Sequence, residues 1–80
     1  MSHKFQKMLK LCRKNFFIGA QNMDVQRVWF WQEMENEVLK YQLIDDGWSK
    51  FRNYIAGKGA SGSAEVNRFC ILLLDVMETI

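Results

Sequence analysis

The sequence predicts an all-α fold, a small four-helix domain with the C-terminal helix central to the core. The segment from Ser63 to Ile80 repeats apolar side chains at the i, i+3, i+4, i+7 spacing of a buried helix face. The chain contains no proline, and its five glycines lie in only three places, at position 19, at position 47 and in the run 57–62. Long proline-free segments separated by glycine favour helices over a turn-rich sandwich.

Residues 4–18 form the first predicted helix. Its apolar stripe consists of Phe5, Met8, Leu9, Cys12 and Phe16. A second strip, on the opposite side, consists of Lys4, Lys7, Leu11, Lys14 and Ile18. This strip is interpreted either as a docking surface for an acidic protein, a phosphate backbone or an anionic membrane, or as a solvated lysine face with two ordinary exposed apolar residues. Gly19 is expected to end the helix as a C-terminal cap.

Residues 24–43 form the second predicted helix, with Asn22 or Asp24 as its N-cap. Its broad apolar face consists of Val28, Phe30, Trp31, Met34, Val38, Leu39 and Tyr41. Each helical step turns about 100°, so three consecutive aromatic residues cannot all enter one core. Trp29 projects to the far side with Val25, Asn36, Lys40 and Leu43. Trp29 is therefore expected either to be covered by another segment or to be left for a partner.

Residues 46–56 and 63–80 form the third and fourth predicted helices. Asp45 or Asp46 is expected to cap the third helix, and Ser61 or Ser63 the fourth. The intervening residues 57–63, GKGASGS, have the composition of a mobile linker. Such a glycine-rich loop could bind an anion through its backbone N–H groups, but the order of the phosphate-binding loop is absent, so a plain interhelical loop is the better interpretation.

Length and composition indicate one globular domain, residues 1–80, because 49% of the 80 residues are hydrophobic. The net charge of +2 is distributed unevenly: residues 1–23 carry five basic residues and no acid, whereas the remainder carries six basic and nine acidic residues. No secretory signal is visible, and the longest apolar run, six residues from Phe69 to Leu74, is too short to span a bilayer. A cytoplasmic protein is expected.

The sequence offers little to catalysis. The only histidine is His3, and no metal-binding spacing such as H-E-x-x-H occurs. The two cysteines, Cys12 and Cys70, are too few for a zinc site or a disulfide framework. They are expected to be buried free thiols, although a bridge between them is left open. The glutamates at positions 33, 35 and 37 are expected on a solvated face. We therefore expect no enzyme activity, no catalytic residue, no metal and no cofactor.

A small protein without a reaction centre is expected to act by stoichiometric binding, as an inhibitor, adaptor or small subunit of a larger protein or nucleoprotein. The candidate anchors are the apolar residues that the core does not need, Trp29, Leu11, Ile18 and Ile71. The alternative is nucleic-acid binding through the basic face of the first helix, Lys4, Lys7, Lys10, Arg13 and Lys14. A homodimer through the surplus apolar surface is also open. A membrane-surface role is disfavoured because the core requires Phe5, Leu9 and Phe16.

Overall fold

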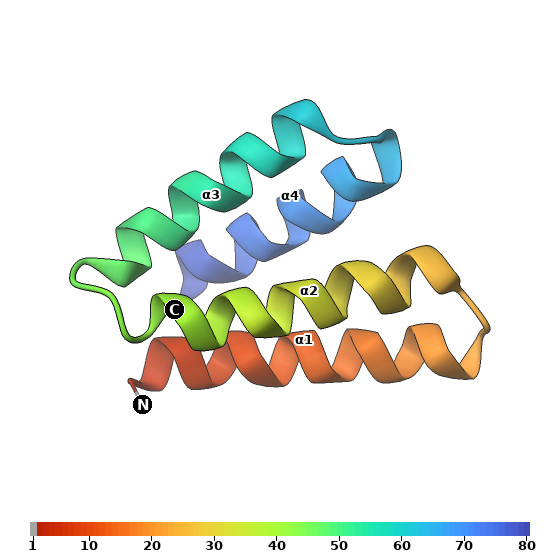
Figure 1. Ribbon diagram of the computed structural model, residues 1–80, viewed down its shortest axis with the longest axis horizontal. Coiled ribbons are helices and arrows are strands. Elements are labelled where there is room, and N and C mark those ends of the chain that lie inside the picture. The colour runs from red at the N-terminus through yellow and green to blue at the C-terminus, as the bar shows by residue number, and fades with distance from the viewer. Residues whose placement is uncertain (1) are drawn as a thin grey trace.

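The structure is a computed structural model that describes residues 2–80. Four helices account for most of this range, α1 (His3–Gln21), α2 (Val25–Tyr41), α3 (Gly47–Ser61) and α4 (Ala64–Thr79). Residues 2–80 contain no strand. The predicted all-α four-helix fold is therefore confirmed (Figure 1).

Side chains at the helix N-termini fix where three of these helices begin. Ser2, Asp24 and Ser63 each accept a hydrogen bond from a backbone N–H in the first turn of α1, α2 and α4. Such bonds satisfy donors that have no partner within the helix. The start of α3 is different, because Asp46 has a left-handed backbone (φ 55°) and its side chain forms no capping hydrogen bond.

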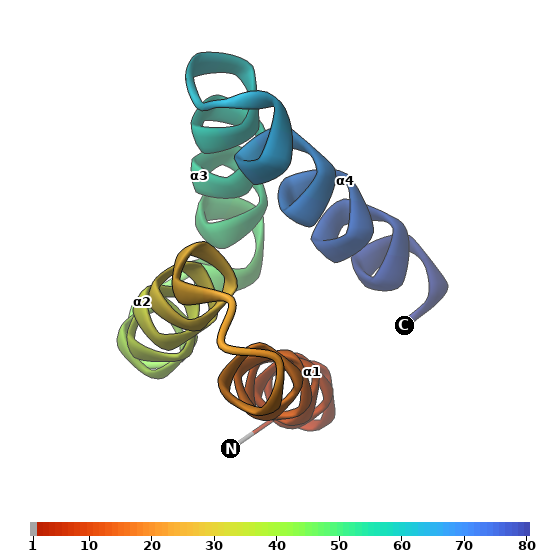
Figure 2. The ribbon, with the colours of Figure 1, turned by 90° about the vertical axis from the view of Figure 1, so that its right-hand side faces the viewer.

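The helices form two antiparallel hairpins, α1 with α2 and α3 with α4 (Figure 1). The second hairpin packs on the first, so that α3 lies over α2 (Figure 2). Within the described residues, α2 and α3 contact each other more extensively than α1 and α4 do. As a result, the contact between the hairpins lies mainly along α2 and α3.

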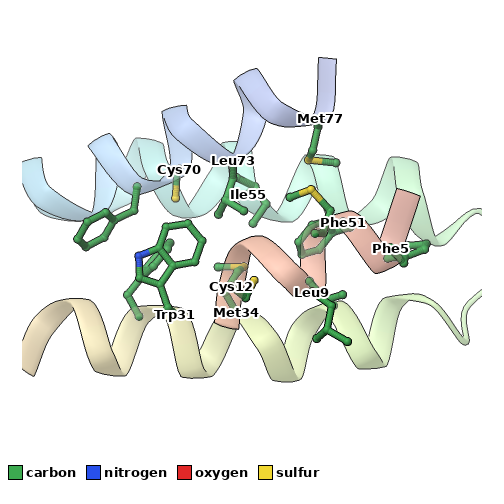
Figure 3. Packing of buried hydrophobic residues seen from close by; sticks show 14 residues of the cluster. Phe5, Leu9, Cys12, Trp31, Met34, Phe51, Ile55, Cys70, Leu73 and Met77 are labelled. Carbon is green, nitrogen blue, oxygen red and sulfur yellow. The ribbon is translucent and has the colours of Figure 1, made fainter. Parts of the chain in front are cut away.

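One hydrophobic core joins the two hairpins, and every helix contributes to it (Figure 3). Its buried members are Phe5, Met8, Leu9, Cys12, Phe30, Trp31, Met34, Val38, Phe51, Ile55, Phe69, Cys70, Leu73 and Met77. Aromatic pairs cross between the hairpins: the ring centroids of Trp31 and Phe69 are 5.8 Å apart, and those of Phe5 and Phe51 are 6.3 Å apart. Such contacts add to the stabilisation that burial itself provides.

Helix α4 is buried along the face that its periodicity predicts, but along that face only. It contributes Phe69, Cys70, Leu73 and Met77 to the core. On its other sides, Ile71 is 49% exposed and Leu72 is 40% exposed. Helix α4 therefore belongs to the core through one face only, because α1 and α2 pack largely against each other.

The linker predicted at residues 57–63 is wrong for residues 57–61, which continue α3 to Ser61. Gly59 is buried against α4, where an added Cβ would lie 2.9 Å from the Cβ of Cys70. Across the same contact, the Asn67 side-chain amide donates to the Gly59 carbonyl at 3.0 Å. Tertiary packing thus offsets the low helix propensity of glycine, which costs about 1 kcal/mol per residue relative to alanine. Only Gly62 and Ser63 separate α3 from α4.

The first helix also continues past its predicted end at residue 18. Gly19 is a buried position inside α1 rather than its cap. An added Cβ at Gly19 would lie 3.0 Å from the Cγ of Arg27 and 3.2 Å from a methyl group of Val28. The glycine therefore allows α1 and α2 to approach closely near their connection, and α1 ends only at Gln21.

Candidate functional site

Trp29 lies on the outside of α2, as its position on the helix predicts. The N-cap bond from the Arg27 N–H to Asp24 Oδ1 (3.2 Å) fixes where the helix starts and hence which residues face inward. Trp31 is completely buried and the Phe30 ring is buried beside it, whereas Trp29 is 72% exposed. Large side chains this exposed are common at binding surfaces.

A groove of about 290 Å³ adjoins Trp29, between α2 and the start of α4. Its lining consists of Gln26, Trp29, Phe30, Glu33, Lys58, Ser63, Val66 and Phe69. The apolar part of this lining comes from both hairpins, because Phe30 belongs to α2 and Val66 and Phe69 belong to α4. The ring centroids of Phe30 and Phe69 are 4.9 Å apart, so these two rings pack against each other within the lining.

The charges that line the groove are paired with each other. Lys58 Nζ donates to Glu33 Oε1 at 3.1 Å, and the Tyr54 hydroxyl donates to the same oxygen at 3.3 Å. Burial and the neighbouring Glu33 carboxylate raise the pKa of Tyr54, so its hydroxyl keeps the proton that it donates. The groove therefore presents apolar rings and a neutralised ion pair, which suits an apolar side chain from a partner.

The other three candidate anchors do not lie with Trp29. Leu11 and Ile18 are only partly exposed on α1, and Leu11 packs against the core. Ile71 is on the outside of α4, and it does not line the groove. Leu11 and Ile18 do not line it either. Among the predicted anchors, only Trp29 combines strong exposure with an adjoining groove.

The five predicted basic residues of α1 are all exposed. Two of them have contacts: Arg13 Nε pairs with Glu35 Oε1 at 3.3 Å, and Lys4 Nζ lies 5.3 Å from the ring centroid of Trp48. Lys7, Lys10 and Lys14 form no ion pair with any acid in residues 2–80. Their spacing of three and four residues places them on one side of α1.

Sequence reasoning missed most of the groove, although it identified Trp29. Val66 and Phe69 are core residues by their spacing, and Lys58 was assigned to a linker. Their position beside Trp29 depends on how the two hairpins pack. The spacing of apolar residues within each helix does not predict this packing. Sequence reasoning also did not single out Phe17 and Met23, which are 60% and 88% exposed.

No cluster of three histidine, cysteine or acidic side chains that could hold a metal occurs in residues 2–80. Cys12 and Cys70 are both free and buried. Burial raises the pKa of the Cys12 thiol to about 12, helped by the charge of Glu35, and burial also raises the pKa of Cys70. Thiols in this state are poor nucleophiles.

Within residues 2–80, no helix is both long and apolar enough to cross a bilayer. Comparisons with protein-family models, with curated proteins and with solved structures each found no match for this chain. The geometry described above is therefore the basis for the proposals that follow.

Proposed function

We propose that the protein is a small non-enzymatic interaction module that binds a larger protein or nucleoprotein stoichiometrically, as an inhibitor, adaptor or small subunit. The observation that supports this proposal best is the pairing of Trp29, which is 72% exposed, with the apolar groove beside it. An exposed aromatic anchor next to a pocket is the arrangement found at binding hot spots, where a few residues contribute most of the affinity.

Trp29 and the groove would act together. The partner inserts an apolar side chain between Val66 and Phe69 on one side and Trp29 on the other. The paired charges of Glu33 and Lys58 at the edge require no counter-charge from the partner, so binding should depend only weakly on salt. An interface of this kind is completed by neighbouring polar contacts that exclude water.

The proposal is tested by capturing proteins from a host lysate with the full chain as bait. We expect Trp29→Ala to reduce capture of a specific partner at least about tenfold, the loss typical of a hot-spot residue. Phe17→Ala is the matched control, since Phe17 is also an exposed aromatic residue but lies on α1. Equal capture by the wild-type chain and Trp29→Ala would contradict the proposal.

The alternative function, nucleic-acid binding, is supported by the three lysines of α1 that have no acidic partner in residues 2–80. A gel-shift titration of the full chain with duplex DNA and with single-stranded RNA tests it at two salt concentrations. Binding through Lys7, Lys10 and Lys14 should weaken steeply as salt rises, and Lys7→Glu combined with Lys14→Glu should abolish it. Unchanged binding by that double variant would exclude the basic face as the site.

A further inference from the structure

The outer side of α2 carries a stripe of four residues whose spacing fits the pairing of two helices. These residues are Val25, Trp29, Gln32 and Asn36, at intervals of four, three and four, and all four are exposed. Val25 and Gln32, and likewise Trp29 and Asn36, are seven residues apart, which is the repeat at which two helices keep a common seam. The half-buried Leu39 continues the stripe, and Leu43, which is 84% exposed, follows in the turn after α2.

From this stripe we infer that the chain pairs with a second copy of itself, α2 against α2, across a two-fold axis. In a parallel pair the two-fold axis runs along the helices, so each residue of the stripe meets its own copy and must tolerate an identical neighbour. Val25 and Trp29 satisfy this requirement as apolar side chains. Gln32 and Asn36 satisfy it as amides, because an amide both donates and accepts hydrogen bonds. The stripe contains no charged residue.

The distribution of charge argues against self-pairing through α1. The outer side of that helix carries Lys7, Lys10 and Lys14, which have no acidic partner in residues 2–80. Two such faces would repel each other. The neutral stripe of α2 meets no such repulsion, and it also includes the most exposed aromatic side chain of residues 2–80. Gln32 and Asn36 both lie at inner positions of the seam, where a polar residue specifies register at a cost in stability.

The charges that flank the stripe favour parallel helices. In a parallel pair, Glu35 of one copy, whose Oε1 pairs with Arg13 of its own chain at 3.3 Å, also lies near Lys40 of the other copy, and symmetry repeats this attraction. An antiparallel pair centred on the stripe would instead bring Glu33 near Gln26 and Glu35 near Val28 of the other copy, so neither glutamate would meet an opposite charge. Lys40 is well exposed, with its nearest carboxylate oxygen, on Glu37, 3.7 Å away, so it remains accessible to a second copy.

This inference deepens the proposed function, because it names a second copy as the partner of the Trp29 face when no larger protein is bound. It rests on the proposed function in one respect, namely that a larger partner uses the same face. A larger partner that uses Trp29 would then have to displace that copy. Self-association should therefore compete with partner binding, and the chain would be released from its dimer when the partner is present.

The first test measures the mass of the purified full chain by sedimentation equilibrium from low to high micromolar concentration. We expect a monomer–dimer equilibrium that Trp29→Ala weakens at least about tenfold. Asn36→Lys should also disrupt it, because it places two like charges across the axis. Phe17→Ala should leave it unchanged. All three positions are exposed, and far-ultraviolet circular dichroism confirms that each variant is folded.

The second test determines orientation by oxidising Val25→Cys and Asn36→Cys separately. The native thiols do not interfere because Cys12 and Cys70 are buried. In a parallel pair, both variants should form disulfide-linked dimers. In an antiparallel pair centred on the stripe, position 25 would face position 36 of the other copy, which lies about 16 Å along the helix from that copy's position 25, so neither variant could cross-link. Failure of either variant to cross-link while the chain still forms dimers would overturn the parallel arrangement.

A chain that remains monomeric throughout, or a dimer that persists in both Trp29→Ala and Asn36→Lys, would overturn the inference. In the first case the stripe would be left for a helix of a different protein. The two proposals fail separately: a monomeric chain whose lysate capture still depends on Trp29 retains the proposed function, whereas a dimer that captures no partner through Trp29 retains only the self-association.

Discussion

Gly57 and Gly59 lie two residues apart in α3, yet their surroundings are different. A Cβ added at Gly59 would approach the Cβ of Cys70 to 2.9 Å, a distance that real Cβ atoms do not show, whereas a Cβ at Gly57 would meet nothing within 4 Å. The glycine at position 59 is therefore required by the contact between α3 and α4. The one at position 57 only lowers the helix propensity.

We predict that Gly59→Ala lowers the free energy of unfolding by about 1–3 kcal/mol, the usual cost of overpacking. Gly57→Ala should raise it by about 0.5–1 kcal/mol, because alanine loses less conformational entropy in a helix. Chemical denaturation of the two variants beside the wild-type chain measures both effects. Stabilisation by both alanines would show that α3 and α4 are not in close contact at Gly59.

The buried thiol of Cys12 predicts how the free energy of unfolding depends on pH. Its pKa is raised from 9.0 to about 12 in the folded protein, chiefly by burial. The folded chain therefore holds the thiol proton more tightly than the unfolded chain does. The free energy of unfolding should not depend on this group below about pH 9, and should fall by about 1.4 kcal/mol per pH unit as the pH rises from 9 toward 12.

Denaturation at a series of pH values, compared with Cys12→Ala, isolates this contribution. The variant is expected to be less stable because of lost packing, so the informative quantity is the slope with pH and not the absolute stability. Tyr54 and Cys70, whose pKa values are also raised, contribute to both proteins equally. Identical slopes in the two proteins would mean that Cys12 ionises as readily when folded as when unfolded.

At the scale of helices, the sequence predicts the number of helices, their order and the buried face of each. These properties follow from the spacing of the apolar residues, because the regular turn of a helix decides which side chains share one face. The two boundaries that were wrong, after residue 18 and after residue 56, both lie at glycine-containing segments: Gly19 and Gly59 are buried against another helix, whereas Gly57 is exposed within α3. A glycine that ends a helix and one that lets a neighbouring helix approach look alike in a single sequence.

The N-cap residue of α2, Asp24, gives a prediction about the stability of a single helix. Asp24→Ala removes the acceptor for the Arg27 N–H and should lower the free energy of unfolding by about 1 kcal/mol. Asp46→Asn is the control, because Asp46 forms no capping bond and asparagine also tolerates its left-handed backbone. We expect little change from the control. Thermal or chemical denaturation that ranks the two variants in the opposite order would contradict the assignment of Asp24 as the cap.

At the scale of the molecule, the candidate site was only partly predictable. The 100° step between residues identifies Trp29 as the aromatic residue that cannot share the core with Trp31. It does not reveal the groove, because Val66 and Phe69 come from α4 and reach Trp29 only when the hairpins pack. Nor does it show which basic residues of α1 are paired, since the partner of Arg13, Glu35, lies on another helix.

The two tryptophans of α2 also test whether the hairpins fold as one unit. Trp31 is fully buried, and its ring lies 5.8 Å from that of Phe69 in the other hairpin, whereas Trp29 is outside the core. Trp31→Ala should therefore cost about 3–5 kcal/mol, a large part of the stability of a small domain. Trp29→Ala should change stability by no more than about 0.5 kcal/mol when measured at low protein concentration, where self-association is absent.

Trp31→Phe separates loss of packing from general disruption of the core. It keeps an aromatic ring between the hairpins, and it removes an indole N–H that is buried without a hydrogen-bond partner in residues 2–80. We expect it to cost less than Trp31→Ala and to leave one cooperative transition seen equally by fluorescence and circular dichroism. Two separate transitions in the wild-type chain would show instead that each hairpin is stable without the other. Equal costs for alanine at positions 29 and 31 would mean that the outer tryptophan is also part of the core, and the binding proposal would then lose its anchor.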